Sequence, residues 1–71
     1  MPKLYSSRQI IKVLRRKGFI FVSQKGSHIK LHKQNKKMLI VIVPDNRKEI
    51  PYGTFRSILR QANLTEGDFK N

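Results

Sequence analysis

The sequence contains no cysteine and no tryptophan, and it has only four aspartate and glutamate residues among 71. Without cysteine the chain forms no disulfide and no thiolate-ligated zinc site, which excludes a secreted disulfide scaffold. A chain of this length builds one small core, so we expect a single domain over residues 1–71. No apolar run approaches the ~20 residues of a membrane helix, and the polar start MPKLYSSRQI does not resemble a signal peptide. We therefore expect a cytoplasmic protein that contacts no membrane.

Positive charge is what the sequence has in excess. Sixteen lysine and arginine residues give a formal charge of +12, and all four carboxylates lie between Asp45 and Asp68. Residues 1–44 contain eight lysines, three arginines and no acidic residue. This charge exceeds the magnitude of ~2–8 that keeps a small domain soluble, and it attracts polyanions such as the backbone of nucleic acids. The composition thus favours polyanion binding over a merely solvated surface.

Two segments have the spacing of amphipathic helices. Ser6 and Gln9 form a capping-box pattern, and apolar residues at helical spacing follow, which predicts a helix over residues 6–17. A second helix is expected to begin around residues 51–54, where a proline suits the first turn, and to end at Asn63.

Three segments between these helices have strand patterns. An aromatic and β-branched run covers residues 19–24, strict alternation covers residues 27–32, and an apolar run lies within residues 37–43, ended by Pro44. Short connections favour an antiparallel meander with both helices on one face, an α+β sandwich of αβββα order. The third strand would then be an edge. Its apolar side chains would be covered either by helices and loops or by a partner protein.

The side chains available for catalysis are few. The strands carry no carboxylate, so a two-metal nuclease or a carboxylate-pair hydrolase has no ligands or acids to use, and no metal site is expected. No glycine-rich phosphate loop precedes a helix. The remaining candidates are His28 and His32, which titrate near neutrality and lie with Lys30 on the strand face opposite Ile29 and Leu31.

RNA supplies its own nucleophile, the 2′-hydroxyl, so its cleavage needs a base, an acid and cationic stabilisation but no metal or cofactor. His28 has the chemistry of a general acid or base. In the residues before it, Lys25 adds charge, Gly26 lets a phosphate approach the backbone closely, and Ser27 adds a donor. The alternative is that His28 and His32 are only solvent-facing polar residues of a strand.

The segments GFIFVSQKGSHIKL (residues 18–31) and VPDNRKEIPYGTFRSILRQANLTEGDF (residues 43–69) resemble the HicA family of toxin mRNA interferases. This resemblance covers nearly the whole chain. It implies a fold like a double-stranded-RNA-binding domain, a single catalytic histidine that matches His28, and cleavage of mRNA. It also implies a cognate HicB-type antitoxin that binds the toxin, covers the histidine and represses their operon. The chain departs from the family pattern at Ser23, at Asp45–Asn46 and at Asn63, and none of these changes touches His28.

Together these observations predict an endoribonuclease toxin in which His28 is the general acid or base. Lys25, Lys30 and His32 would hold the phosphate, with Gly26 and Ser27 beside them. The alternative is a non-catalytic RNA-binding module, for which the same element order and charge are natural. A DNA-binding accessory protein fits less well, because no short helix-turn-helix connection pairs the two helices.

Overall fold

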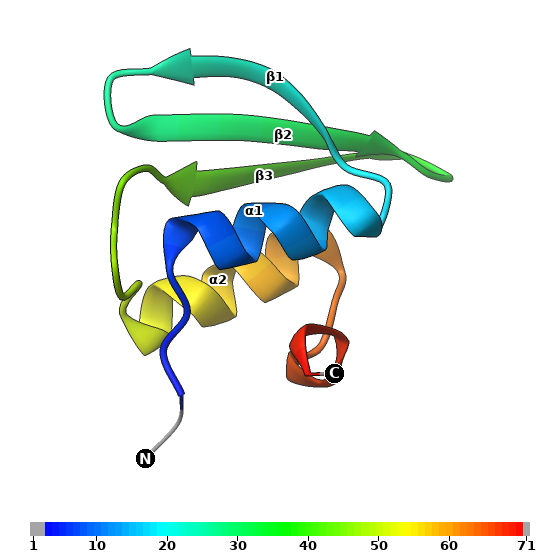
Figure 1. Cartoon of the computed structure of the whole chain (residues 1–71). Coiled ribbons are helices and arrows are strands. Elements are labelled where there is room, and N and C mark those ends of the chain that lie inside the picture. The colour runs from blue at the N-terminus through cyan, green and yellow to red at the C-terminus, as the bar shows by residue number, and fades with distance from the viewer. Residues whose placement is uncertain (1–2, 71) are drawn as a thin grey trace.

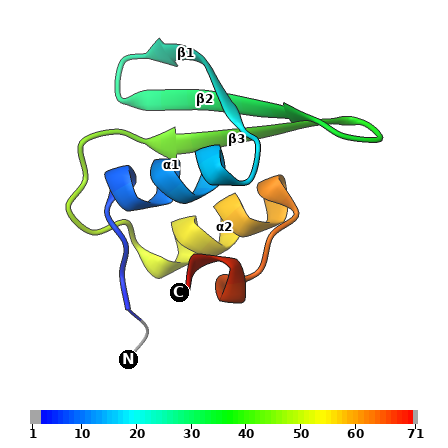
Figure 2. The same cartoon turned by 45° about the vertical axis from the view of Figure 1, so that its right-hand side comes forward.

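The computed structural model describes residues 3–70, and its sheet is an antiparallel meander in the order β1-β2-β3. Helices α1 and α2 lie on one face of this sheet (Figures 1 and 2). The arrangement confirms the expected α+β class and αβββα order. A short 3₁₀ helix follows, so the elements are α1 (Ser7–Arg16), β1 (Ile20–Lys25), β2 (His28–Gln34), β3 (Met38–Pro44), α2 (Tyr52–Ala62) and η1 (Glu66–Phe69).

The helix ends follow local signals in the sequence. The Ser6 Oγ accepts from the Gln9 backbone N–H at 3.1 Å, and the Gln9 side chain accepts from the Ser6 N–H at 2.9 Å. This reciprocal pair is the expected capping box, and α1 begins immediately after it. Helix α2 ends at Asn63, whose φ of 57° is left-handed, as predicted for a residue that stops a helix. Both helices therefore lie within one or two residues of their predicted bounds.

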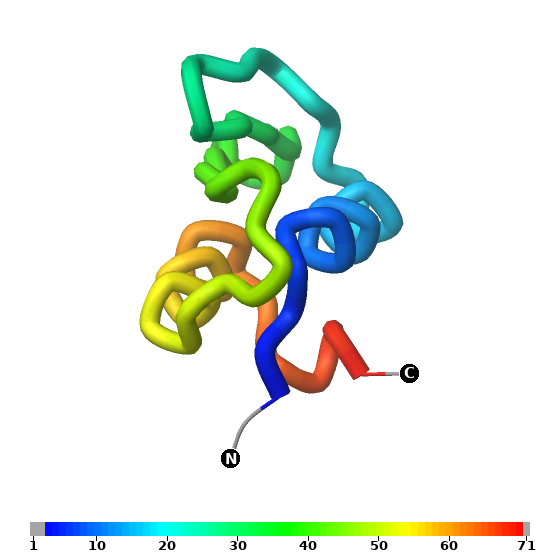
Figure 3. Tube along the Cα trace, turned by 60° about the vertical axis from the view of Figure 1, so that its left-hand side comes forward, coloured from blue at the N-terminus to red at the C-terminus, as the bar shows by residue number. Residues whose placement is uncertain are grey.

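The core lies between the helices and one face of β2 and β3. Ile29 and Leu31 of β2 and Val41 and Val43 of β3 alternate into this layer, and each is buried. The helices contribute the apolar residues Ile10, Val13, Leu14, Phe55, Ile58, Leu59 and Ala62. Alternation in β2 and β3 therefore leaves the opposite side of the sheet, called the open face below, without a covering layer (Figure 3).

An aromatic cluster attaches the end of the chain to its beginning. The ring of Phe69 in η1 meets that of Phe55 edge to face at 5.0 Å and that of Tyr5 at 5.6 Å between centroids. Such pairs add to the stabilisation that burial of the rings already provides. The cluster holds η1 against α1 and α2 on the side away from the sheet.

The strands differ from their predicted ranges in detail. Strand β1 begins and ends one residue later than predicted, because Lys25 still pairs with His28 across the hairpin. Strand β2 extends to Gln34, which pairs with Met38, so the ladder continues where the sequence predicted a polar loop. Every residue of β1 is exposed, because this strand projects beyond the helix layer (Figure 3).

Strand β3 is an edge, as expected, and its apolar residues divide between the two faces. Val41 and Val43 are buried, whereas Met38, Ile40 and Ile42 are 38–45% exposed on the open face. The Gln61 side chain of α2 accepts a hydrogen bond from the Ile42 backbone N–H at 2.9 Å. A helix thus covers part of the edge, while the outer side chains stay accessible.

Candidate nucleic-acid interface

The hairpin between β1 and β2 places His28 at the first position of its strand. Lys25 pairs with His28, so Gly26 and Ser27 are the two central residues of a tight turn. Gly26 has a φ of +59° and Ser27 does not have a positive φ, which is the pattern of a type II′ hairpin turn with glycine at its first central position. His28 is exposed at the end of the sheet.

Two residues that the sequence analysis did not assign to the site hold this hairpin in place. The Gln24 side-chain amide donates to the Gly26 carbonyl at 3.2 Å and to the Asp45 carboxylate at 2.7 Å. The Asp45 backbone N–H donates to the Ser27 carbonyl at 2.7 Å. The turn before His28 is therefore bonded to its own strand and to the residue that follows β3. No local sequence pattern predicts these contacts, because Gln24 and Asp45 are 21 residues apart.

The open face carries the predicted polar row of β2 between two less polar strands. His28 lies between Lys25 of β1 and Pro44 of β3 in the ladder. Lys30, one step along, lies between Ser23 and Ile42. A basic group therefore stands beside His28 across the hairpin and another lies next along its own strand, as the alternation predicted.

His32 lies farther from the hairpin than the other candidate residues. It is half-buried and pairs with Ile20 on one side and Ile40 on the other. It lies four steps along the strand from His28, which corresponds to roughly 13 Å at ~3.3 Å per residue. The structure thus brings Lys25, Gly26, Ser27 and His28 together, with Lys30 next to them and His32 at a distance. Their roles in binding and catalysis remain predictions.

None of the four carboxylates, all of which lie within the described residues, forms an ion pair with a lysine of the open face. Asp68 forms the one ion pair of residues 3–70, with Lys17 at 3.2 Å, and Glu66 accepts a hydrogen bond from the Tyr52 hydroxyl. That hydrogen bond raises the pKa of Tyr52. Asp45 accepts from Gln24 at the hairpin. The lysines of the open face therefore keep their charge available for an anion.

Two further observations concern residues 3–70 as a whole. Within this range, no group of three or more histidine, aspartate or glutamate side chains gathers as metal ligands do. No helix of the same range is long and apolar enough to cross a membrane.

The fold and this face define a small, strongly basic α+β protein with an exposed histidine in a cationic hairpin. The family model of HicA toxins of bacterial toxin–antitoxin systems matches residues 7–64, from the start of α1 to just beyond α2. The chain belongs to this family, and it is the toxin of a toxin–antitoxin system. The family is associated in general with ribonuclease activity, and membership implies a cognate antitoxin. Among curated proteins, none matches the chain.

Proposed function

We propose that this toxin is a metal-independent endoribonuclease that cleaves mRNA in the bacterial cytoplasm with His28 as its catalytic residue. The observation that carries the proposal is the exposed position of His28 at the start of β2, with Lys25 across the hairpin and Lys30 on the same face. Membership of a family associated with ribonuclease activity supports the reaction class. Cleavage of mRNA would arrest translation and growth.

The reaction needs little from the protein because RNA carries its own nucleophile. The 2′-hydroxyl oxygen attacks the adjacent phosphorus, the bond to the 5′ oxygen breaks, and the products are a 2′,3′-cyclic phosphate and a 5′-hydroxyl. His28 either takes the proton from the 2′-hydroxyl or gives one to the leaving 5′ oxygen, a contribution of about 10²–10⁴ in rate, and water exchanges the other proton. Lys25 and Lys30, with His32 farther along, would stabilise the charge that grows on the phosphoryl oxygens. Gly26 and Ser27 would let the phosphate approach the turn.

The direct test incubates the purified toxin with a long mRNA in excess EDTA. We expect fragments that end in cyclic phosphate or 3′-phosphate, and we expect His28→Ala to lose at least about 10²-fold in cleavage rate. His32→Ala is the comparison variant, and it should lose much less rate than His28→Ala, because His32 lies roughly 13 Å along the strand and would stabilise charge only from a distance. Cleavage that depends on added metal, or a folded His28→Ala protein that still cleaves, would refute the mechanism.

The alternative function is a non-catalytic RNA-binding module of the double-stranded-RNA-binding type, for which the charge and element order are equally suitable. In that case neither the parent toxin nor the His28→Ala variant would cut the mRNA, and both would bind it and retard it in a gel. Substitution of His28 would then only weaken RNA binding, by the amount that one lost phosphate contact accounts for.

We also propose that the partner is a HicB-type antitoxin that covers the open face and with it His28. The observation that supports this is the pair of apolar rows beside the polar row of β2, formed by Ile20 at the start of β1 and by Met38, Ile40 and Ile42 of β3. Each of these side chains is 38–58% exposed. A partner with apolar side chains for these rows and carboxylates for the lysines between them would exclude RNA from the site.

A further inference from the structure

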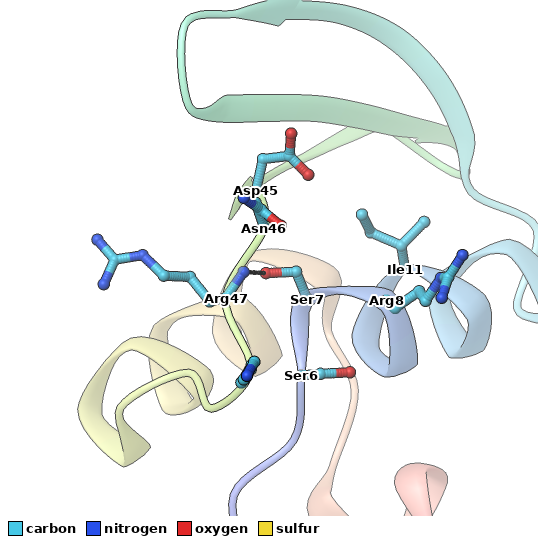
Figure 4. Close-up of a pocket in the computed structure, with 8 residues that line it drawn as sticks. Ser6, Ser7, Arg8, Ile11, Asp45, Asn46 and Arg47 are labelled. Carbon is cyan, nitrogen blue, oxygen red and sulfur yellow. Dashed lines mark hydrogen bonds between the residues drawn. The ribbon is translucent and has the colours of Figure 1, made fainter.

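A hollow of about 610 Å³ lies between the start of α1 and the loop that joins β3 to α2 (Figure 4). This basic hollow is lined by Ser6, Ser7, Arg8, Ile11 and residues 45–48. We propose that the basic hollow binds the phosphate backbone of the RNA beyond the step cleaved at His28. The inference rests on the proposed function, because it presumes an RNA substrate at the hairpin.

The basic hollow has a fixed frame. The Ser7 hydroxyl, on a residue that is only 4% exposed, donates to the Pro44 carbonyl at 2.6 Å and accepts from the Arg47 backbone N–H at 2.9 Å. The Ser7 N–H donates in turn to the Arg47 carbonyl at 3.0 Å. The loop is therefore bonded to α1 through its backbone. The side chains of Arg47 and Lys48 are thus on the loop side of the hollow, and Arg8 is on its helix side.

Three cations border the basic hollow, and none of them forms an ion pair within the described residues. Figure 4 shows Arg47 and Arg8 extending on opposite sides of it, and Lys48 follows Arg47 in the loop. Asp45, the carboxylate of the lining, points toward the strands, where it accepts from Gln24. Cations on both sides of a hollow that are not paired with a carboxylate create a positive potential across it, and an extended polyanion can contact them in turn.

The class of ligand follows from the donors that are present. At the start of α1, the N–H groups of Ser7, Gln9 and Ile10 are already bonded, to Arg47 and to Ser6. Binding therefore relies mainly on the side-chain cations. Long cationic side chains contact phosphates without reading bases. The basic hollow thus fits an RNA backbone of any sequence.

The basic hollow adjoins the hairpin that carries His28 through Asp45, which belongs to the lining and bonds to the turn. His28 pairs with Pro44, and the next residue, Asp45, donates its N–H to the Ser27 carbonyl. A strand of RNA that leaves His28 across the end of the sheet therefore meets this loop first. By contrast, Arg56 and Arg60 of α2 border a different hollow, together with residues near η1.

The test measures RNA binding in the His28→Ala background, where cleavage does not interfere. One variant adds Arg47→Ala and Lys48→Ala, and the matched control adds Arg56→Ala and Arg60→Ala, so that both lose two exposed charges. A labelled single-stranded RNA is titrated at several salt concentrations. We expect the slope of log Kd against log salt to fall by about 1.4 in the first variant, since each single-strand phosphate contact contributes about 0.7, and to stay unchanged in the control. Thermal melts check that both proteins are folded.

A second readout uses proteins with His28 intact. The Arg47→Ala and Lys48→Ala substitutions should raise KM for a long RNA with little change in kcat, because they remove contacts outside the reacting step. Cleavage of a dinucleotide, which cannot reach the basic hollow, should be unaffected. This inference would be overturned if the two double variants lost the same amount of salt slope, or if the slope of the first were unchanged. The proposed function would still stand if the parent protein cleaved RNA. A parent protein that neither binds nor cuts RNA would overturn both.

Discussion

The hairpin that presents His28 depends on one backbone angle, the φ of +59° at Gly26. A Cβ at this position would meet no other atom within 4 Å, so there is space for a side chain. Only the backbone conformation disfavours substitution, because a positive φ costs a residue with a Cβ about 1–2 kcal/mol of conformational free energy. The positive φ of the turn therefore favours glycine at position 26 for its conformation and not for lack of space.

Gly26→Ala should accordingly lower the free energy of unfolding by about 1–2 kcal/mol, measured by urea denaturation. The control is Gly53→Ala in the first turn of α2, where a Cβ also meets nothing within 4 Å and φ is not positive. That substitution should raise the free energy of unfolding by about 0.4–1 kcal/mol, because it restricts the unfolded chain. Effects of the same sign at the two glycines would contradict this account of the turn.

At the scale of elements, η1 is the smallest and is held by one carboxylate. The backbone N–H of Thr65 donates to Asp68 at 2.8 Å, and Lys17 of α1 lies 3.2 Å from the other carboxylate oxygen. The Thr65 hydrogen bond, and after it Lys17, hold the pKa of Asp68 below its usual value. Phe69 follows directly and packs into the aromatic cluster. Docking of this turn is therefore linked to the charge of Asp68.

The sign of this linkage gives a prediction about acid. A carboxyl group with a lowered pKa in the folded state stabilises that state at pH values above its ordinary pKa. The contribution is lost as pH falls through the lowered value. Asp68→Asn should therefore melt at a lower temperature than the parent near neutral pH, and the two melting curves should converge in acid. A difference in melting temperature that is the same at every pH would refute the role of the charge.

At the scale of the whole molecule, the open face combines uncompensated positive charge with exposed apolar rows. Ile40 and Phe21 offer a matched comparison, since they are 45% and 55% exposed. Ile40 pairs with His32 on the open face, whereas Phe21 pairs with the buried Leu31 and so belongs to the opposite face.

If the antitoxin covers the open face, Ile40→Asp should weaken its binding by at least about 30-fold, which corresponds to the 2 kcal/mol of an interface hot spot. Phe21→Asp should change the affinity much less. Isothermal titration with the purified antitoxin measures both, and circular dichroism confirms that each variant is folded. A larger loss for Phe21→Asp would place the antitoxin on the helix side of the sheet.

How far the sequence predicts this molecule depends on the range of the contacts. Ser6 with Gln9, Asn63, and the alternation around His28 act through neighbours in the chain, and each was predicted correctly. By contrast, the hydrogen bonds from Gln24 to Asp45 and between Ser7 and the loop join residues that are 21 to 40 positions apart. Local sequence patterns do not predict such pairs. The contacts that support the hairpin, and the basic hollow itself, are therefore visible only in the structure.

The outer edge of β3 has a consequence for a toxin that exists without its partner. The Ile42 N–H points away from the sheet and bonds to Gln61. Every second residue of an edge strand points its N–H in this direction, so the next such position is Pro44, and proline has no N–H. At these two positions β3 offers no free N–H to an added strand. The edge of β3 is therefore a poorer template for strand addition than its apolar side chains alone would suggest, which disfavours edge-to-edge pairing through β3 between toxin copies that are not bound to an antitoxin.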